Sequence, residues 1–332
     1  MPSLDLYGQQ SGAAFDQLTA QFTAFRAAFD EELGAALSFD FLPFVLQQEL
    51  NGALTLDLET VRGIALMREW AGTRVVEDAL QGFDNVIKTR KYVATESIQR
   101  DEYNANPNGL GLITSKIAGL ADESAQHVLR MFAAVLEGNG QSVSALTAAG
   151  IEPDLAKLGS MKALDGKALF AVDHPLANGA TYSNLSTGGH STANFTVSMT
   201  AMKKIPEWLH GRRIDNRPTH VLTPIGLTPR YKQLLESQYD PDKANKANNP
   251  NLNAVQLVEC PFLMDDTKVY LINARRAQMK PIVHAITYPA HLDQQIDPQS
   301  DSVYDRDAYK FGANGRYVMV PGHAFTAFCI TA

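Results

Sequence analysis

The chain has 332 residues, of which 45% are hydrophobic and 20% are charged, and its formal net charge is −7. This length and composition can bury a sizeable core and predict about two domains or one elaborate one. The acidic balance argues against tight, unspecific binding to nucleic acid or to an acidic membrane surface, because a phosphate-binding surface needs concentrated Lys and Arg.

Local features narrow the class of protein further. The first residues, MPSLDLYGQQ, have neither a basic start nor a long apolar run, so we expect no secretory signal. No stretch approaches the ~18 apolar residues that cross a bilayer, and we expect a cytoplasmic protein. Cys260 and Cys329 lack CxxC spacing, which predicts buried free thiols in place of a disulfide or a metal pair.

Basic residues occur as short pairs that are scattered along the sequence. The pairs are Lys203 with Lys204, Arg212 with Arg213, and Arg275 with Arg276. We assign them to solvated faces or subunit contacts in preference to nucleic-acid contacts.

The N-terminal region predicts an arm. Residues 13–35 are rich in Ala and Phe, and their spacing predicts an amphipathic helix with Phe22 and Phe25 on its apolar side. A helix with so much apolar surface and little chain before it must dock on its own body or on a neighbour. The apolar clusters at 39–46 and 54–58 then predict an extended arm in place of a compact subdomain.

Residues 84–100 (DNVIKTRKYVATESIQR) alternate β-branched or aromatic residues with charged ones, and neither face is cleanly apolar. Such a pattern predicts a two-stranded projection whose open edges pair with, or lie across, another chain. A short stretch upstream holds Arg68, Glu69, Trp70 and Arg74 around a glycine. Because Trp and Arg are enriched at binding hot spots, we favour Trp70 as an interface anchor, with a core aromatic as the alternative.

Residues 113–137 (ITSKIAGLADESAQHVLRMFAAVLE) keep apolar residues at helical spacing without a proline, which predicts a long spine helix. Gly138 and Gly140 follow, where helices commonly terminate. The apolar side of the spine helix needs a partner surface, and we expect the returning chain of residues 302–331 to supply it.

Candidate catalytic groups follow the spine helix. Asp173, His174 and His190 are candidate metal ligands of a hydrolase, and Ser183 with His174 and an aspartate is a candidate nucleophilic set. Neither spacing supports the chemistry, because zinc helices place ligands at i and i+4 and a triad is recognised from geometry. Pro175 biases His174 towards an extended conformation, so we expect an ordered surface turn, with no metal and no cofactor.

The later part of the chain mixes helical and strand patterns, which predict a compact α+β lobe. The predicted helices are 197–205 and 228–237, the predicted strands are 219–224, 254–259, 268–273 and 281–288, and the polar loop 240–253 is expected to be mobile. Beyond this lobe, Asn314-Gly315 predicts a hairpin turn between two further strands. We expect the apolar C-terminal strand beside the spine helix, since the lobe looks complete without it.

This order of elements resembles the HK97-type fold of tailed-phage capsid proteins, and local motifs resemble the major head subunit of Mu-like phages and prophages. The motifs, within a likeness over about residues 20 to 330, are Arg68-Glu69-Trp70-Ala71-Gly72-Thr73-Arg74-Val75-Val76, Lys91-Tyr92, Asp165-Gly166, Phe170, His174-Pro175 and Asn184-Leu185. One departure is Asn106-Pro107-Asn108, where that family is associated with an acidic pair before the spine helix.

The resemblance implies an α+β chain with the HK97-like capsid fold. Its parts would be an N-terminal arm (1–57), an extended β-loop (58–92), a peripheral domain with the spine helix (93–189 and 296–332) and an axial domain (190–295). The expected inter-subunit contact residues are Phe22, Phe25, Arg68, Glu69, Trp70, Arg74 and Lys91.

The function that the resemblance implies is structural, not enzymatic. The chain would be a major capsid protein that self-assembles through hexamers and pentamers into an icosahedral head, and would enclose DNA without sequence-specific binding. Its partners would be further copies, a scaffold, a portal and a decoration or minor capsid protein, first in the host cytoplasm and then in the virion. The alternatives are a cargo-enclosing nanocompartment shell of the same fold and, from another class, the metal-dependent hydrolase.

Overall fold

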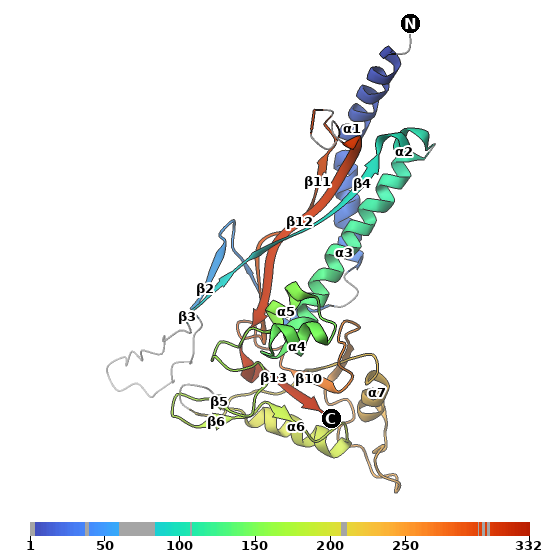
Figure 1. Cartoon of the computed structure of the whole chain (residues 1–332). Helices are drawn as coiled ribbons and strands as arrows, with labels where there is room; N and C mark the ends of the chain where they lie inside the picture. The colour runs from blue at the N-terminus through green and yellow to red at the C-terminus, as the bar shows by residue number, and fades with distance from the viewer. Residues whose placement is uncertain are drawn as a thin grey trace, which may run out of the picture. The chain divides into compact units, whose positions relative to one another are not determined.

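The computed structural model describes residues 4–36, 40–59, 84–106, 108–206, 211–297, 299–300, 303 and 306–332 (Figure 1). The chain divides into two compact units. The first comprises Met1–Asp40, Thr89–Leu129 and Ile286–Tyr317, and the second comprises Phe41–Lys88, Arg130–Ala285 and Val318–Ala332. Each unit is therefore assembled from three separate segments of the chain. Among the described helices, none is both long enough and apolar enough to cross a bilayer.

The first unit combines long helices with long antiparallel strands (Figure 1). Its elements, three of which continue into the second unit, are α1 (Leu4–Ala36), β4 (Arg90–Gln99), α2 (Arg100–Ala105), α3 (Gly109–Gly138), β11 (Ile282–Gln295) and β12 (Ala308–Pro321). Strand β12 is antiparallel to β4, from Ala308 opposite Gln99 to Tyr317 opposite Arg90. These two strands end a four-stranded sheet of order β1-β11-β12-β4, in which β1 is Val45–Glu49.

Apolar side chains from α1, α3 and the strands form the core of the first unit. Its buried members include Leu18, Phe25, Phe29, Ile98, Ile113, Ile117, Leu120, Tyr309 and Phe311. The rings of Phe25 and Phe311 meet edge to face, with centroids 6.1 Å apart. Because Ile113 and Ile117 share this core with β12, the predicted contact between the spine helix and the returning chain is confirmed for β12.

The spine helix is confirmed as part of α3, and its end is fixed by close backbone packing. A Cβ added at Gly138 would lie 2.3 Å from the Cα of Gly159, the last residue of α5 (Pro153–Gly159). Gly140 has a φ of +71° and its N–H donates to the carbonyl of Gly159 at 2.9 Å. Any side chain at 138 would therefore push α5 away from the end of α3.

The second unit is built on a five-stranded mixed sheet. Its strands lie in the order β7 (Leu185–Ser186), β13 (Ala327–Thr331), β10 (Lys268–Ile272), β8 (His220–Thr223) and β9 (Gln256–Glu259). Strand β10 is antiparallel to both of its neighbours, whereas β13 with β7 and β8 with β9 are parallel pairs. The expected position of the C-terminal strand beside the spine helix is therefore wrong, because β13 fills the gap between β7 and β10.

Two helices supply the apolar cover of this sheet. Helices α6 (Thr192–Lys204) and α7 (Thr228–Glu236) pack with Val269 and Leu271 of β10 in one buried cluster. Tyr270 points to the other face of the sheet, where its ring lies 5.2 Å from that of Phe170. These helices and strands confirm the predicted α+β lobe, except that it needs β13 to be complete.

The remaining elements are short. They are the 3-10 helices Leu42–Phe44 and Ala324–Thr326, strands β2 (Thr55–Glu59), β3 (Asp84–Lys88), β5 (His174–Pro175) and β6 (Thr181–Tyr182), and helix α4 (Val143–Ala148).

The predicted two-stranded projection over residues 84–100 is wrong for its second half. Strand β3 pairs with β2 in a two-stranded sheet, but β4 pairs with β12. Alternate residues of β4 are covered, and Ile98 is 1% exposed. The covered side also carries Glu96, whose carboxylate accepts from Lys116 Nζ on α3 at 2.9 Å. Because Glu96 lies on the covered side, the sequence of β4 shows charged residues on both faces of the strand.

The predicted hairpin turn at Asn314-Gly315 is also wrong, because β12 runs straight through it opposite Tyr92 and Val93. A Cβ added at Gly315 would lie 3.1 Å from the Cα of Ala290 in β11. The glycine therefore permits close packing of β11 on β12, although its dipeptide is the same as that of a turn.

The loop 240–253 is held by specific hydrogen bonds, contrary to the expected mobile loop. Asn249 Nδ2 donates to the carbonyls of Leu234 and Ser237 at 2.8 and 2.9 Å, and Asn249 is 8% exposed. Asp242 accepts from the backbone N–H of Thr192 at 2.6 Å. These bonds hold a largely exposed polar segment in place through its few buried side chains, which are Asp240, Asn249 and Asn251.

Packing in the first unit predicts different costs for two phenylalanines of α1. Phe25→Ala removes a buried ring beside Phe311 and should lower the free energy of unfolding by about 3 to 5 kcal/mol. Phe22 is only half-buried, so Phe22→Ala should cost clearly less. Urea unfolding of the unassembled subunit checks this. Equal losses in the two variants would contradict the packing described.

Burial of two histidines predicts acid sensitivity of the second unit. Burial lowers the pKa of His284 and of His323 to about 4, from an ordinary value of 6.5. Below pH 6.5 the unfolded chain gains protons that the folded chain does not, so each histidine should cost about 1.4 kcal/mol of unfolding free energy per pH unit until the pH reaches about 4. Urea midpoints measured from pH 7 to 4 should fall less steeply for His284→Gln/His323→Gln. Identical slopes in both proteins would exclude this effect.

Candidate functional site

The predicted contact residues lie in different settings. Arg68, Glu69, Trp70 and Arg74 fall outside the described residues. Lys91 is exposed on β4, the outer strand of its sheet. It remains a candidate for contact with a neighbouring molecule.

The two phenylalanines of α1 differ in availability. The Phe22 ring is half-buried at the border of the first unit's core, with the guanidinium carbon of Arg26 5.6 Å from its centre. Phe25 is 5% exposed and packs on Phe311. Its side chain is therefore used inside the subunit, and only Phe22 keeps surface that a neighbour can cover.

The ribbon of β2 and β3 pairs the first residues of the predicted extended loop (58–92) with residues further along the same loop. Thr55 lies opposite Lys88, and Glu59 lies opposite Asp84. The chain segment between Glu59 and Asp84, which contains Trp70, therefore starts and finishes at neighbouring positions.

A pocket of about 120 Å³ opens in the first unit. Its lining includes Tyr92, His127 and Tyr317. The rings of Tyr92 and His127 are 4.4 Å apart, and His127 Nδ1 lies 3.1 Å from the hydroxyl of Tyr317. Val93, another lining residue, is 67% exposed. The combination offers an aromatic hollow with exposed apolar surface.

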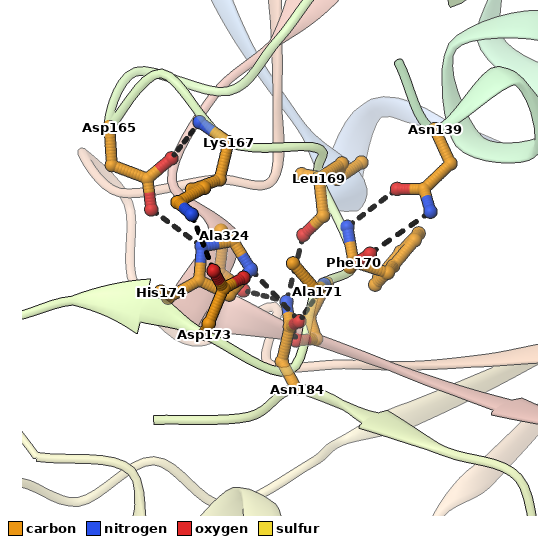
Figure 2. Close-up of polar contacts among 11 residues, drawn as sticks. Asn139, Asp165, Lys167, Leu169, Phe170, Ala171, Asp173, His174, Asn184 and Ala324 are labelled. Carbon is orange, nitrogen blue, oxygen red and sulfur yellow. Dashed lines mark hydrogen bonds and ion pairs between the residues drawn. The ribbon is translucent and has the colours of Figure 1, made fainter. Parts of the chain in front are cut away.

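The later motifs of the resemblance come together in the second unit as one polar network (Figure 2). His174 Nδ1 lies 2.5 Å from Asp165 Oδ2, and Asp165 Oδ1 accepts from the backbone N–H of Lys167 at 3.1 Å. The Lys167 ammonium forms an ion pair with Asp173. The hydrogen bond from Lys167 holds the pKa of Asp173 below its usual range.

Asn184 is the centre of this network (Figure 2). Its Nδ2 donates to the carbonyls of Leu169 and Ala324, at 2.8 and 2.9 Å. Its Oδ1 accepts from the backbone N–H of Ala171 at 2.9 Å and lies 3.0 Å from His174 Nε2. One buried carboxamide thus joins an irregular loop to the segment before β13.

The hydrogen bonds around His174 determine which of its ring nitrogens donates. Because the Asn184 amide group faces carbonyls that only accept, its Oδ1 is the acceptor and His174 Nε2 donates to it. The other ring nitrogen, Nδ1, is hydrogen-bonded to the Asp165 carboxyl group. The ring is 0% exposed and stacks on Tyr182 at 5.0 Å. The expected surface turn is therefore wrong. Extended backbone before Pro175 is confirmed, but it places a fully bonded side chain inside.

The candidate ligands of a metal-dependent hydrolase do not come together. Asp173 pairs with Lys167, and His174 bonds to Asp165 and Asn184. His190 is elsewhere, with Nδ1 3.0 Å from the Tyr231 hydroxyl and Nε2 3.1 Å from the Thr267 carbonyl oxygen. The hydroxyl of Ser183 donates to the carbonyl of Leu185, at 3.0 Å. Within the described ranges, no cluster of His, Cys, Asp and Glu has the geometry of a metal site.

The two cysteines are buried free thiols, as predicted. Burial raises the pKa of Cys260 to about 11 and that of Cys329 to about 12. Neither forms a reactive thiolate near neutral pH.

The sequence did not reveal the role of Asn184. Its partners are at positions 169, 171, 174 and 324, and no local pattern marks a side chain whose partners are so distant. A second loop contact was missed for the same reason: Asn139 exchanges hydrogen bonds with the backbone of Phe170, at 2.6 and 3.0 Å.

The hydrogen bonds of the Asn184 side chain predict that an almost isosteric substitution, Asn184→Asp, strongly destabilises the fold. Asn184→Asp removes both donors and places an acceptor against the carbonyls of Leu169 and Ala324, so it should lower the free energy of unfolding by about 3 kcal/mol or more. The matched control is Asn178→Asp, because Asn178 is exposed in the same loop and its Oδ1 only accepts, from the N–H of Ala180. The control should cost less than about 0.5 kcal/mol. Urea unfolding measures both changes, and similar losses would refute the role of Asn184.

Comparison with known proteins shows likeness in structure alone. No protein-family model matches the chain, and no curated protein sequence matches it.

Three solved structures are similar to this chain, and each similarity covers most of both chains. The procapsid subunit of bacteriophage JBD30 is 14% identical, with 94% of this chain and 75% of that chain covered, at a TM-score of 0.51. The subunit of the bacteriophage PhiM1 mature capsid is 12% identical, covers 89% of this chain with 87% of its own, and has a TM-score of 0.51. The capsid subunit of cyanophage P-SCSP1u is 8% identical, covers 89% of this chain with 88% of its own, and has a TM-score of 0.50. The chain therefore has the α+β, HK97-like fold of phage capsid subunits.

Proposed function

We propose that this chain is a major capsid protein, a non-enzymatic subunit that assembles through hexamers and pentamers into an icosahedral phage head. The observation that carries the proposal is the fold, because the likeness covers 89% to 94% of the chain for both a procapsid and a mature capsid. The bonded positions of Asp173, His174 and His190 support a structural role in place of hydrolysis.

The motif series adds a finer proposal, that the head is of the Mu-like type. With it belongs the division into an N-terminal arm (1–57), an extended loop (58–92), a peripheral domain (93–189 and 296–332) and an axial domain (190–295). This division follows expected roles in a shell, whereas the two compact units follow packing. The spine helix accordingly belongs to one proposed domain but is divided after Leu129 between the units.

The proposed contacts between copies involve one segment of the extended loop and one exposed strand residue. Arg68, Glu69, Trp70 and Arg74 belong to the segment between Glu59 and Asp84, two residues that the β2–β3 ribbon pairs with each other. Lys91 is exposed on β4. Many modest contacts of this kind become strong when one subunit makes them simultaneously with several neighbours.

The proposal includes partners and location. The shell encloses genomic DNA without reading its sequence, and it forms in the host cytoplasm with a scaffold, a portal and a decoration or minor capsid protein. The finished location is the virion. Support comes from similar structures, which include a capsid decorated with minor capsid protein trimers and a procapsid with a size determination protein.

Electron microscopy of the chain, expressed with a scaffold from its own gene neighbourhood, tests this function. We expect closed icosahedral shells. Monomers at high concentration with scaffold present would refute the proposal. Shells that contain an enzyme cargo, with no portal gene nearby, would instead identify a nanocompartment.

Trp70 supplies a sharper test of the contact surface. Removing a hot-spot ring commonly costs about 2 kcal/mol or more per contact, so Trp70→Ala should raise the subunit concentration needed for shell formation by at least about 30-fold. Trp70→Phe keeps an aromatic ring and should recover most of the assembly. The urea midpoint of unassembled Trp70→Ala should match the original chain. An unfolded variant would place Trp70 in the core.

A further inference from the structure

The basic pairs that are scattered in the sequence converge in the second unit. They lie at the end of α6, in the segment 211–217 and in the turn after β10. We call the following residues the basic cluster: Lys203, Lys204, Arg212, Arg213, Arg217, Arg275 and Arg276. Pairs that are scattered along the sequence are therefore on neighbouring segments of the fold.

A buried asparagine fixes the three segments to one another. Asn216 is 1% exposed, and its Nδ2 donates to the carbonyl of Met202 in α6 at 3.2 Å. Its Oδ1 accepts from Asn273 Nδ2 at 3.1 Å, at the start of the turn after β10. An isolated β-bridge between Pro206 and Arg213 ties the end of α6 to the segment 211–217 a second time. The positions of the charges are thus built into the fold.

One carboxylate lies within the basic cluster, and it is already occupied. Both Asp215 oxygens accept from Arg217, at 2.7 and 2.8 Å, and the Asp215 carbonyl accepts from Arg276 Nη2 at 3.2 Å. The hydrogen bond from Arg217 holds the pKa of Asp215 below its usual range, and the charges of Arg275 and Arg276 lower it further. In the described part of the chain, no carboxylate pairs with Arg213 or Arg275.

The local charge is opposite to that of the chain. Among the described residues, the seven cationic members and the Asp215 carboxylate sum to a net charge of +6, which leaves −13 for the rest of a chain whose total is −7. Arginine predominates, and its planar guanidinium matches the geometry of phosphate oxygens. Such a concentration of charge is the feature that nucleic-acid binding requires.

We propose that the basic cluster binds the phosphate backbone of nucleic acid. The proposal rests on the shell function, because the packaged genome is the nucleic acid that a capsid subunit meets. It adds the residues and the chemistry of that contact.

The surroundings favour nucleic acid over an acidic protein segment. Protein interfaces depend on buried apolar anchors, whereas non-specific nucleic-acid binding depends on charge alone. The large apolar side chains that the described residues expose are Leu42, Leu54, Val86, Val93, Val172, Val197, Ile225, Tyr239, Leu252 and Met264. None belongs to the three segments of the basic cluster, so the described surface there offers charge without an apolar anchor.

Binding of the unassembled full chain to a fluorescent mixed-sequence DNA duplex tests the proposal. Anisotropy titrations between about 50 and 200 mM salt should give a Kd that rises steeply with salt. Arg213→Glu/Arg275→Glu should weaken binding at least tenfold at 100 mM salt and reduce the slope of log K against log salt by about 2. The matched control is Lys162→Glu/Lys232→Glu, which makes the same change in net charge at exposed positions on other segments of the unit. It should change the affinity less than about twofold.

Each other outcome would overturn the proposal. Equal weakening by both variants would show that total charge is responsible, and unchanged binding by Arg213→Glu/Arg275→Glu would show that the basic cluster takes no part. Tighter binding of poly-glutamate than of the duplex would identify an acidic protein segment as the partner. Electron microscopy separates this result from shell assembly, because shells of normal shape from Arg213→Glu/Arg275→Glu would show that self-assembly is intact while DNA contact is lost.

Discussion

The second unit depends on asparagine side chains that replace the hydrogen bonds of regular secondary structure. Much of its chain is irregular, yet buried backbone carbonyls and N–H groups still need partners. A carboxamide can donate twice and accept twice, so one side chain can hold several segments. Buried asparagines do this at Asn184, Asn216, Asn249, Asn251 and Asn273. Polar satisfaction, more than strand pairing, therefore sets the arrangement around the small sheet.

Features that depend on the local spacing of apolar residues could be predicted from the sequence. Features that depend on contacts between residues distant in the sequence could not. The spine helix was predictable because its apolar spacing persists for 25 residues within α3. Asn314-Gly315 misled because a glycine that allows close strand packing has the same sequence as a turn glycine. His174 was placed outside because nothing near it in sequence announces Asn184 as its partner. The candidate contact site was predictable only as residue types, and the basic cluster only as unconnected pairs.

In the proposed shell subunit, different tasks fall to different parts of the chain. The core of the first unit commits Phe25 and Phe311 to internal packing. The proposed contacts with neighbouring copies use exposed residues such as Lys91. The basic cluster gathers seven of the 29 Lys and Arg residues of an acidic chain, so the proposed contact with phosphates stays local and the rest of the subunit repels nucleic acid.

The place of β13 inside its sheet means that the sheet can be completed only at the end of synthesis. Because β13 lies between β7 and β10, the sheet stays split until residues 327–331 have left the ribosome, although its other four strands emerge earlier. Long-range pairing of this kind is slow, and unpaired strand edges are exposed to association with other chains meanwhile. A nascent subunit therefore cannot complete this sheet early, which delays its entry into any assembly that recognises the finished unit.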